Sequence, residues 1–137
     1  MIEVYSNNIE VTEGAAIPFN NVTIKKGCTA ELSAPATIQL NKCGVYMVSC
    51  DATAVNEGEA SETLGIQLTK NGLPQPQAQA SATGETGDTV ALGFTTLVQV
   101  AENNTCCCCT SPTTIQVLNS GADATLTNIN VSVTKIC

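Results

Sequence analysis

The sequence lacks arginine, histidine and tryptophan, and these absences exclude several classes of function. Histidine is the commonest general base and the commonest metal ligand, so Ser-His-Asp and Cys-His catalysis are excluded. The basic residues are Lys25, Lys26, Lys42, Lys70 and Lys135, which are scattered along a chain with twelve acidic residues and a net charge of −7. A nucleic-acid-binding protein needs a basic surface to neutralise phosphates, so we expect no binding to DNA or RNA.

Aromatic residues and long apolar runs are also scarce. Two tyrosines and two phenylalanines argue against an aromatic-lined ligand pocket. No stretch approaches the roughly 20 apolar residues of a membrane helix, so we expect no membrane partner. The first thirty residues lack the basic start and apolar core of a secretory signal, so we expect synthesis without a signal peptide. This composition favours a structural protein over an enzyme.

The hydrophobic pattern predicts strands and almost no helix. Apolar and polar residues alternate most clearly in Gly44–Val55, Thr63–Lys70 and Thr89–Ala101, and Asn71-Gly72 is a strong hairpin signal. Shorter strands are expected at 9–11, 15–19, 22–24, 37–40, 75–82, 113–118 and 124–136. The side chains expected to face the core are Tyr46, Val48, Cys50, Leu64, Ile66, Leu68, Val90, Leu92 and Phe94. We therefore predict an all-β fold, an antiparallel sandwich or barrel of about ten strands in one domain spanning residues 1–137.

Several short motifs, in order along the chain, resemble one family. They are Ala16-Ile-Pro-Phe19, Gly44-Val-Tyr46, Lys70-Asn-Gly72, Gly87-Asp-Thr-Val90, Thr95-Thr-Leu-Val-Gln-Val100 and the cysteine-rich tract Cys106–Thr113. The chain from about Ala16 to Ile136 resembles the tumour necrosis factor-like and complement-type jelly rolls, most closely those of Firmicute phage and exosporium surface proteins. The resemblance implies a jelly-roll homotrimer on a surface or fibre, with its threefold contact on the strands at 37–40, 44–55 and 124–136. No collagen-like Gly-x-y stalk precedes the domain, which favours a free-standing knob or decoration subunit.

Four of the eight cysteines form the consecutive run Cys106–Cys109. Neighbours on an extended chain point to opposite sides, and consecutive Cα atoms, about 3.8 Å apart, are closer than a relaxed disulfide requires. Partners should therefore come from Cys28, Cys43, Cys137 or the run in another subunit. A thiolate metal site is an alternative, although the Cys-x₂-Cys spacing of such sites is missing, and reduced thiols are a third. We assign no cofactor to the chain.

The remaining cysteines and the acidic loop have simpler interpretations. Cys50 shares a strand face with apolar neighbours and should be a small buried hydrophobe. Cys43, in a turn, and Cys137 should be exposed and oxidised. Glu57, Glu59 and Glu62 surround a glycine without the Asp-x-Asp-x-Asp spacing of a calcium loop, so we expect a solvated acidic loop.

The sequence thus predicts a non-enzymatic structural protein. The hypothesis is a jelly-roll trimer that forms part of a phage particle, as a capsid decoration, head fibre or similar subunit, and is cross-linked through cysteine. Its partners would be copies of itself and other particle proteins, and its location a virion or another extracellular surface assembly. A receptor- or glycan-binding knob and a spore-surface protein are the alternatives. The scarcity of aromatic side chains that stack on sugars counts against glycan binding.

Overall fold

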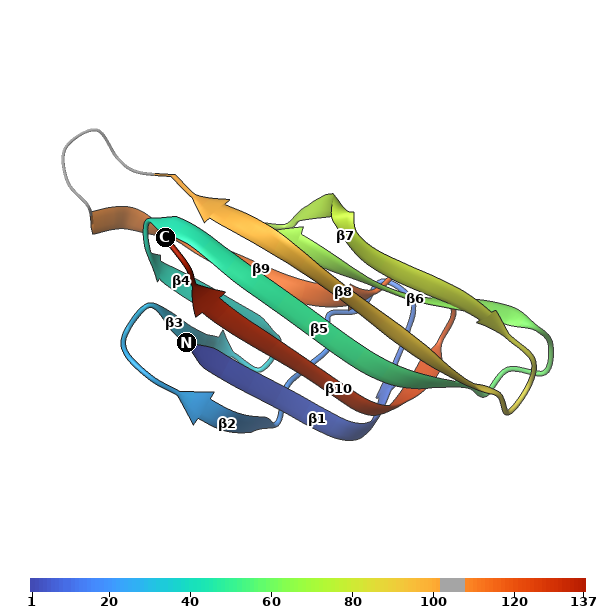
Figure 1. Ribbon diagram of the computed structural model, residues 1–137. Helices are drawn as coiled ribbons and strands as arrows, with labels where there is room; N and C mark the ends of the chain where they lie inside the picture. Colours follow the sequence, from blue (N-terminus) through green and yellow to red (C-terminus); the bar gives the residue numbers. More distant parts are fainter. Residues whose placement is uncertain (102–107) are drawn as a thin grey trace.

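Ten strands and no helix make up the part of the chain that the structure describes. The computed structural model describes residues 1–101 and 108–137, the stretch 108–112 by its backbone. The strands are β1 (Ile2–Val11), β2 (Asn21–Lys25), β3 (Ala30–Ala34), β4 (Thr37–Lys42), β5 (Gly44–Asn56), β6 (Glu62–Lys70), β7 (Leu73–Gly84), β8 (Thr89–Val100), β9 (Cys108–Asn119) and β10 (Ala124–Lys135) (Figure 1). Since the described residues form no helix, none of them forms a helix that could span a membrane. The predicted all-β class is confirmed.

The strands form two antiparallel five-stranded sheets that pack face to face. Sheet A has the order β2-β1-β10-β5-β8, and sheet B the order β3-β4-β9-β6-β7. Most neighbours within a sheet are far apart in sequence, because the chain crosses repeatedly from one sheet to the other. The first long strand, β1, and the last, β10, lie side by side inside sheet A, so both ends of the chain are needed to complete it (Figure 1).

The core fills the space between the sheets and contains the side chains expected from the alternation. Tyr46, Val48, Cys50, Leu64, Ile66, Leu68 and Leu92 are buried, and Val90 and Phe94 are half-buried against them. The last two belong to β8, the edge strand of sheet A, which has a ladder neighbour on one side only.

The structure contains a strand that was not predicted, β3, and β1 begins at Ile2 rather than at residue 9. It also differs from the prediction at residues 15–19 and at the start of β9. Residues 15–19 are irregular apart from one bridge between Ala16 and Leu118, because Pro18 has no N–H to continue a ladder; Ile17 and Phe19 are nevertheless buried. Strand β9 begins at Cys108 rather than at 113, because β4 extends to Lys42 and supplies a ladder partner for Cys108. The second half of the cysteine run therefore belongs to a strand rather than to a connection. Cys106 and Cys107 lie outside the described residues.

Two buried asparagines hold the loops at one end of the sandwich. The Asn119 side chain donates to the carbonyls of Val11 and Ala122, each at 3.0 Å, and accepts from the Gly121 N–H at 3.0 Å. Asn56 does the same for another loop, donating to Ala60 and Gly84 and accepting from Gly58. Each side chain satisfies three backbone groups that water would otherwise have to reach, so we infer that both loops are rigidly held.

We expect Asn119→Ala to lower the free energy of unfolding by about 2–3 kcal/mol, because it leaves buried backbone groups without partners. Urea unfolding followed by circular dichroism measures the change. Asn7→Ala is the control, since the Asn7 amide accepts only an exposed bond from Asn128; it should change stability by less than about 0.5 kcal/mol. Equal losses of unfolding free energy in the two variants would contradict the proposal that Asn119 holds the loops in place.

Candidate functional site

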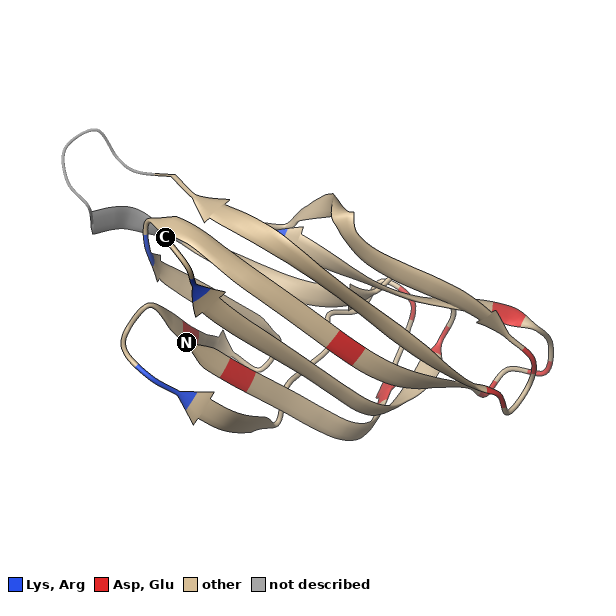
Figure 2. Ribbon diagram, viewed as in Figure 1, with Lys and Arg blue, Asp and Glu red and all other residues tan. Residues whose placement is uncertain are grey.

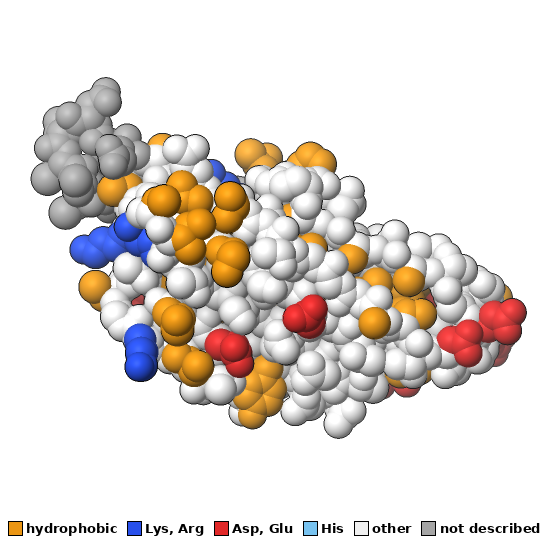
Figure 3. Space-filling model, in the orientation of Figure 1, with side chains coloured by type: hydrophobic (Ala, Val, Ile, Leu, Met, Phe, Trp, Pro, Cys, Tyr) orange, Lys and Arg blue, Asp and Glu red, His pale blue; other side chains and the backbone are white. Residues whose placement is uncertain are grey.

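The outer face of sheet A carries an exposed apolar patch. Met47 on β5 and Leu97 on β8 are paired in the ladder and are 41% and 56% exposed. Ile136, just beyond β10, is 49% exposed and donates its N–H to the Val45 carbonyl at 2.8 Å. Figure 3 shows hydrophobic side chains gathered over the neighbouring ends of these strands. We call Met47, Leu97 and Ile136 the sheet A patch.

The middle of the same face is polar. Ser49 and Thr95 share a hydrogen bond of 3.2 Å, and Ser132 donates to the Glu3 carboxylate at 3.3 Å. Asp51 lies opposite Gly93, where an added Cβ would come within 2.9 Å of its Oδ1. Gly93 therefore leaves space beside this exposed carboxylate. The face thus combines an apolar region at one end with hydroxyl and carboxylate groups at its centre.

The structure brings the scattered lysines to one half of the molecule. Lys25 pairs with Ile2, Lys135 pairs with Tyr46, and Lys42 ends β4 immediately before the turn into β5. These residues and Lys26 lie at one end of the sandwich, which we call the lysine end. Figure 2 shows the lysines in this half and most carboxylates at the opposite end. Sequence order could not reveal this grouping, because it follows from ladder pairings between distant strands.

The lysine end is built around a tight turn between β4 and β5. The Tyr46 hydroxyl donates to the Lys42 carbonyl at 2.7 Å and accepts from the Lys42 N–H at 3.2 Å. Gly44 has a φ of 136°, and an added Cβ there would lie 2.3 Å from the Cys137 carbonyl oxygen and 2.7 Å from Lys135 Cε. Gly44 therefore lets the end of β10 and the Lys135 side chain close over the turn.

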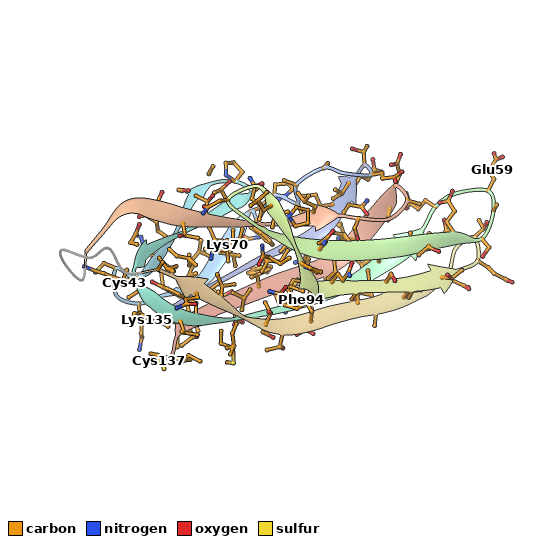
Figure 4. All side chains as sticks on the ribbon, turned by 90° about the horizontal axis from the view of Figure 1, so that it is seen from above. Cys43, Glu59, Lys70, Phe94, Lys135 and Cys137 are labelled. Carbon is orange, nitrogen blue, oxygen red and sulfur yellow. The ribbon has the colours of Figure 1, made fainter. Side chains whose placement is uncertain are left out.

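This closure corrects the prediction for Cys43. The turn was expected to expose its thiol, but Cys43 is only 9% exposed because the segment following β10 folds over the turn. Cys28 and Cys137 are exposed free thiols at the same end, and β9 starts there at Cys108 (Figure 4 labels Cys43, Lys135 and Cys137). The three described cysteines proposed as partners of the run thus lie in the same region as its second half.

Cys50 is a buried free thiol in the core. Burial first, and the charge of the neighbouring Asp51 second, raise the pKa of the Cys50 thiol from 9.0 to about 12. A thiol with this pKa stays protonated at neutral pH and is a poor nucleophile and metal ligand. Within residues 1–101 and 113–137, whose side chains the structure describes, no three His, Cys, Asp or Glu side chains are grouped to hold a metal ion.

The end opposite the lysines is acidic and hollowed. The carboxylates there belong to Glu10, Glu13, Glu57, Glu59, Glu62, Glu85, Asp88 and Asp123, on four separate segments. A hollow of about 710 Å³ is lined by Glu10, Glu13, Glu57, Glu62 and Asp123. We call it the acidic hollow. The predicted acidic loop supplies two of these residues; the others were missed, since they meet only through the pairing of Val11 with Ala124 and of Ala124 with Asn56.

Solved structures with the same arrangement of strands identify the fold. Eiger TNF from S. frugiperda superposes with a TM-score of 0.72 at 11% identity, over 99% of this chain and 92% of that chain. The globular domain of zebrafish complement 1qA protein gives 0.61 at 8%, over 96% and 94%. PRD1 vertex protein P5 gives 0.55 at 15%, over 99% and 96%. The fold is a TNF-like jelly roll.

The jelly-roll resemblance drawn from the sequence motifs is therefore confirmed at the level of fold. No known family and no curated protein matches the sequence itself. At such low identity the shared TNF-like architecture carries no residue-level function across, so the surfaces described above must supply it.

We expect Cys50 to reduce stability at alkaline pH. The folded state holds the thiol proton up to a pKa of about 12, whereas the unfolded chain releases it near 9.0. Its contribution is therefore complete below pH 9 and is lost as the pH rises toward 12. Between about pH 8 and pH 10.5, wild type should lose roughly 2 kcal/mol more than Cys50→Ala, measured by urea unfolding. Equal losses in the two proteins would contradict this.

Proposed function

We propose that the protein is a non-enzymatic structural protein that assembles into homotrimers through the outer face of sheet A. This proposal rests on the sheet A patch, in which three large apolar side chains are about half exposed on neighbouring strands. Soluble domains seldom leave such side chains clustered in water unless the surface makes a contact. The TNF-like fold supports this proposal, since the family resemblance implies a trimer.

The position of the patch refines the expected threefold contact. Strand β5 carries Met47, and β10 is followed directly by Ile136, so both strands stay in the proposed contact. Strand β4 belongs to sheet B, and we replace it with β8, which carries Leu97 at the free edge of sheet A. Contact there covers the unpaired edge of β8 as well as the patch, and exposed edges need such protection. Each half-exposed side chain gains on the order of 1 kcal/mol when fully buried.

We place this trimer in a virion or another extracellular surface assembly, with other particle proteins as further partners. The similarity in fold to PRD1 vertex protein P5 supports this placement. The TNF and complement 1qA domains support the broader role of a surface module. An enzymatic role has little support, because the chain has no histidine and the buried Cys50 thiol is protonated.

Leu97→Glu should dissociate the trimer, because it places a carboxylate inside the proposed contact, next to Met47. We expect the dissociation constant to rise at least about tenfold, which corresponds to roughly 1.4 kcal/mol. Sedimentation velocity across a concentration series measures it. Leu73→Glu is the matched control, since Leu73 is 68% exposed but lies on sheet B. Dissociation by both variants, or by neither, would contradict the assignment of the contact.

The cysteine run should form at least one disulfide with a cysteine outside itself, in the same chain or another. The lysine end supports this expectation, because Cys28, Cys43 and Cys137 lie there beside the start of β9 at Cys108. Such a bridge would add roughly 2–4 kcal/mol to the stability if unstrained. Non-reducing mass spectrometry of the native assembly detects it. Alkylation of all four run cysteines without prior reduction would contradict covalent locking and leave bound metal to test by elemental analysis.

A further inference from the structure

The two ends of the sandwich have opposite charge and different shape. At one end the Lys25–Lys26 pair precedes Gly27, whose φ is 74° and whose added Cβ would meet no atom within 4 Å. Lys25, Lys26 and Gly27 are all exposed, so this turn carries two ammonium groups in contact with solvent. At the other end, the acidic hollow is concave and lined by carboxylates from three separate parts of the chain.

The two charged ends cannot neutralise each other within one copy, because the length of the sandwich separates them (Figures 2 and 4). Lys135 lies at one end and Glu59 at the other in Figure 4. A hollow of about 710 Å³ is within the range of pockets that hold ligands, roughly 300–1,000 Å³, so it is large enough to admit the side chains of a two-lysine turn.

We propose that copies of this protein associate head to tail, with the Lys25–Lys26 turn of one copy in the acidic hollow of the next. The second copy is the partner because it presents the complementary charge and the complementary shape. The contact joins two different surfaces, so it does not close on itself and can continue as a chain. It uses neither Met47 nor Leu97, so it does not require the trimer contact.

The contact should depend strongly on salt, because it joins exposed charges. Charges at the surface interact over about 30 Å in 0.01 M salt but over only about 3 Å in 1 M salt. The net charge of −7 makes copies repel one another in other orientations, which favours the end-to-end arrangement. Association should therefore appear at low ionic strength and disappear as salt is added.

The test uses two variants that each lack one end of the contact. The first carries Lys25→Glu and Lys26→Glu; the second carries Glu13→Gln, Glu57→Gln and Glu62→Gln. Sedimentation velocity in about 0.01 M salt should show wild type in chains several times larger than its basal oligomer, whereas each variant alone stays at the basal size. Mixed in equal amounts, the variants should form complexes of two basal oligomers and no larger species, since each supplies the end that the other lacks.

The control variants change a lysine and a glutamate that lie outside the proposed contact. Lys70→Glu changes a lysine whose Nζ donates to the Gln99 carbonyl. Glu59→Gln changes a carboxylate that does not line the hollow. Both control variants should form chains as wild type does. The proposal is overturned if wild type forms no chains at low salt, if either test variant alone still forms them, if the controls abolish them, or if the mixed variants fail to pair. None of these outcomes depends on the Leu97→Glu experiment, so failure of the trimer is detected separately.

Discussion

The position of β10 between β1 and β5 is the constraint on which the rest of the structure depends. Its ladder sets Val133 beside Ile2 and Lys135 beside Tyr46 at one end, and Ala124 beside Val11 and Asn56 at the other. The pairings with β1 join residues more than a hundred positions apart, and those with β5 join residues 68 and 89 positions apart. They also decide which loops meet, so the lysine end, the acidic hollow and the sheet A patch all follow from one strand's register. A one-residue shift of β10 would turn its buried side chains outward and separate these groups.

The surface of the molecule is divided along its length. The large hydrophobic side chains that are exposed in the described residues are Met1, Val22, Ile24, Met47, Leu73, Leu97 and Ile136, and they lie in the same half as the lysines. The exposed thiols of Cys28 and Cys137 belong to that half too. The opposite half exposes mainly carboxylates and small polar groups. This division suits a subunit that makes apolar contacts with one half and charged contacts with the other.

Much of the fold could be predicted from the sequence because strand alternation is a local signal. The burial of Tyr46 and Leu68 follows from the recurrence of apolar residues at every second position of their strands. Asn71-Gly72 predicts its hairpin directly, and Asn71 has a positive φ of 50°. The candidate surfaces were predicted less well. From the sequence, the lysines were described as scattered and Cys43 was expected to be exposed. The predicted start of β9 was five residues too late. Each of these depends on which distant strands become neighbours, and alternation within one strand does not contain that information.

The central claim is that the outer face of sheet A is covered by other copies. The solvent accessibility of Met47 is its most direct test. Met47 is 41% exposed in a single copy, so its thioether should be oxidised readily by hydroxyl radicals when the face is free. Footprinting followed by mass spectrometry, in salt high enough to screen end-to-end contacts, compares the native assembly with the same protein diluted below its dissociation constant. We predict slow oxidation of Met47 in the assembly and fast oxidation after dilution. Fast oxidation of Met47 at every concentration would contradict the claim.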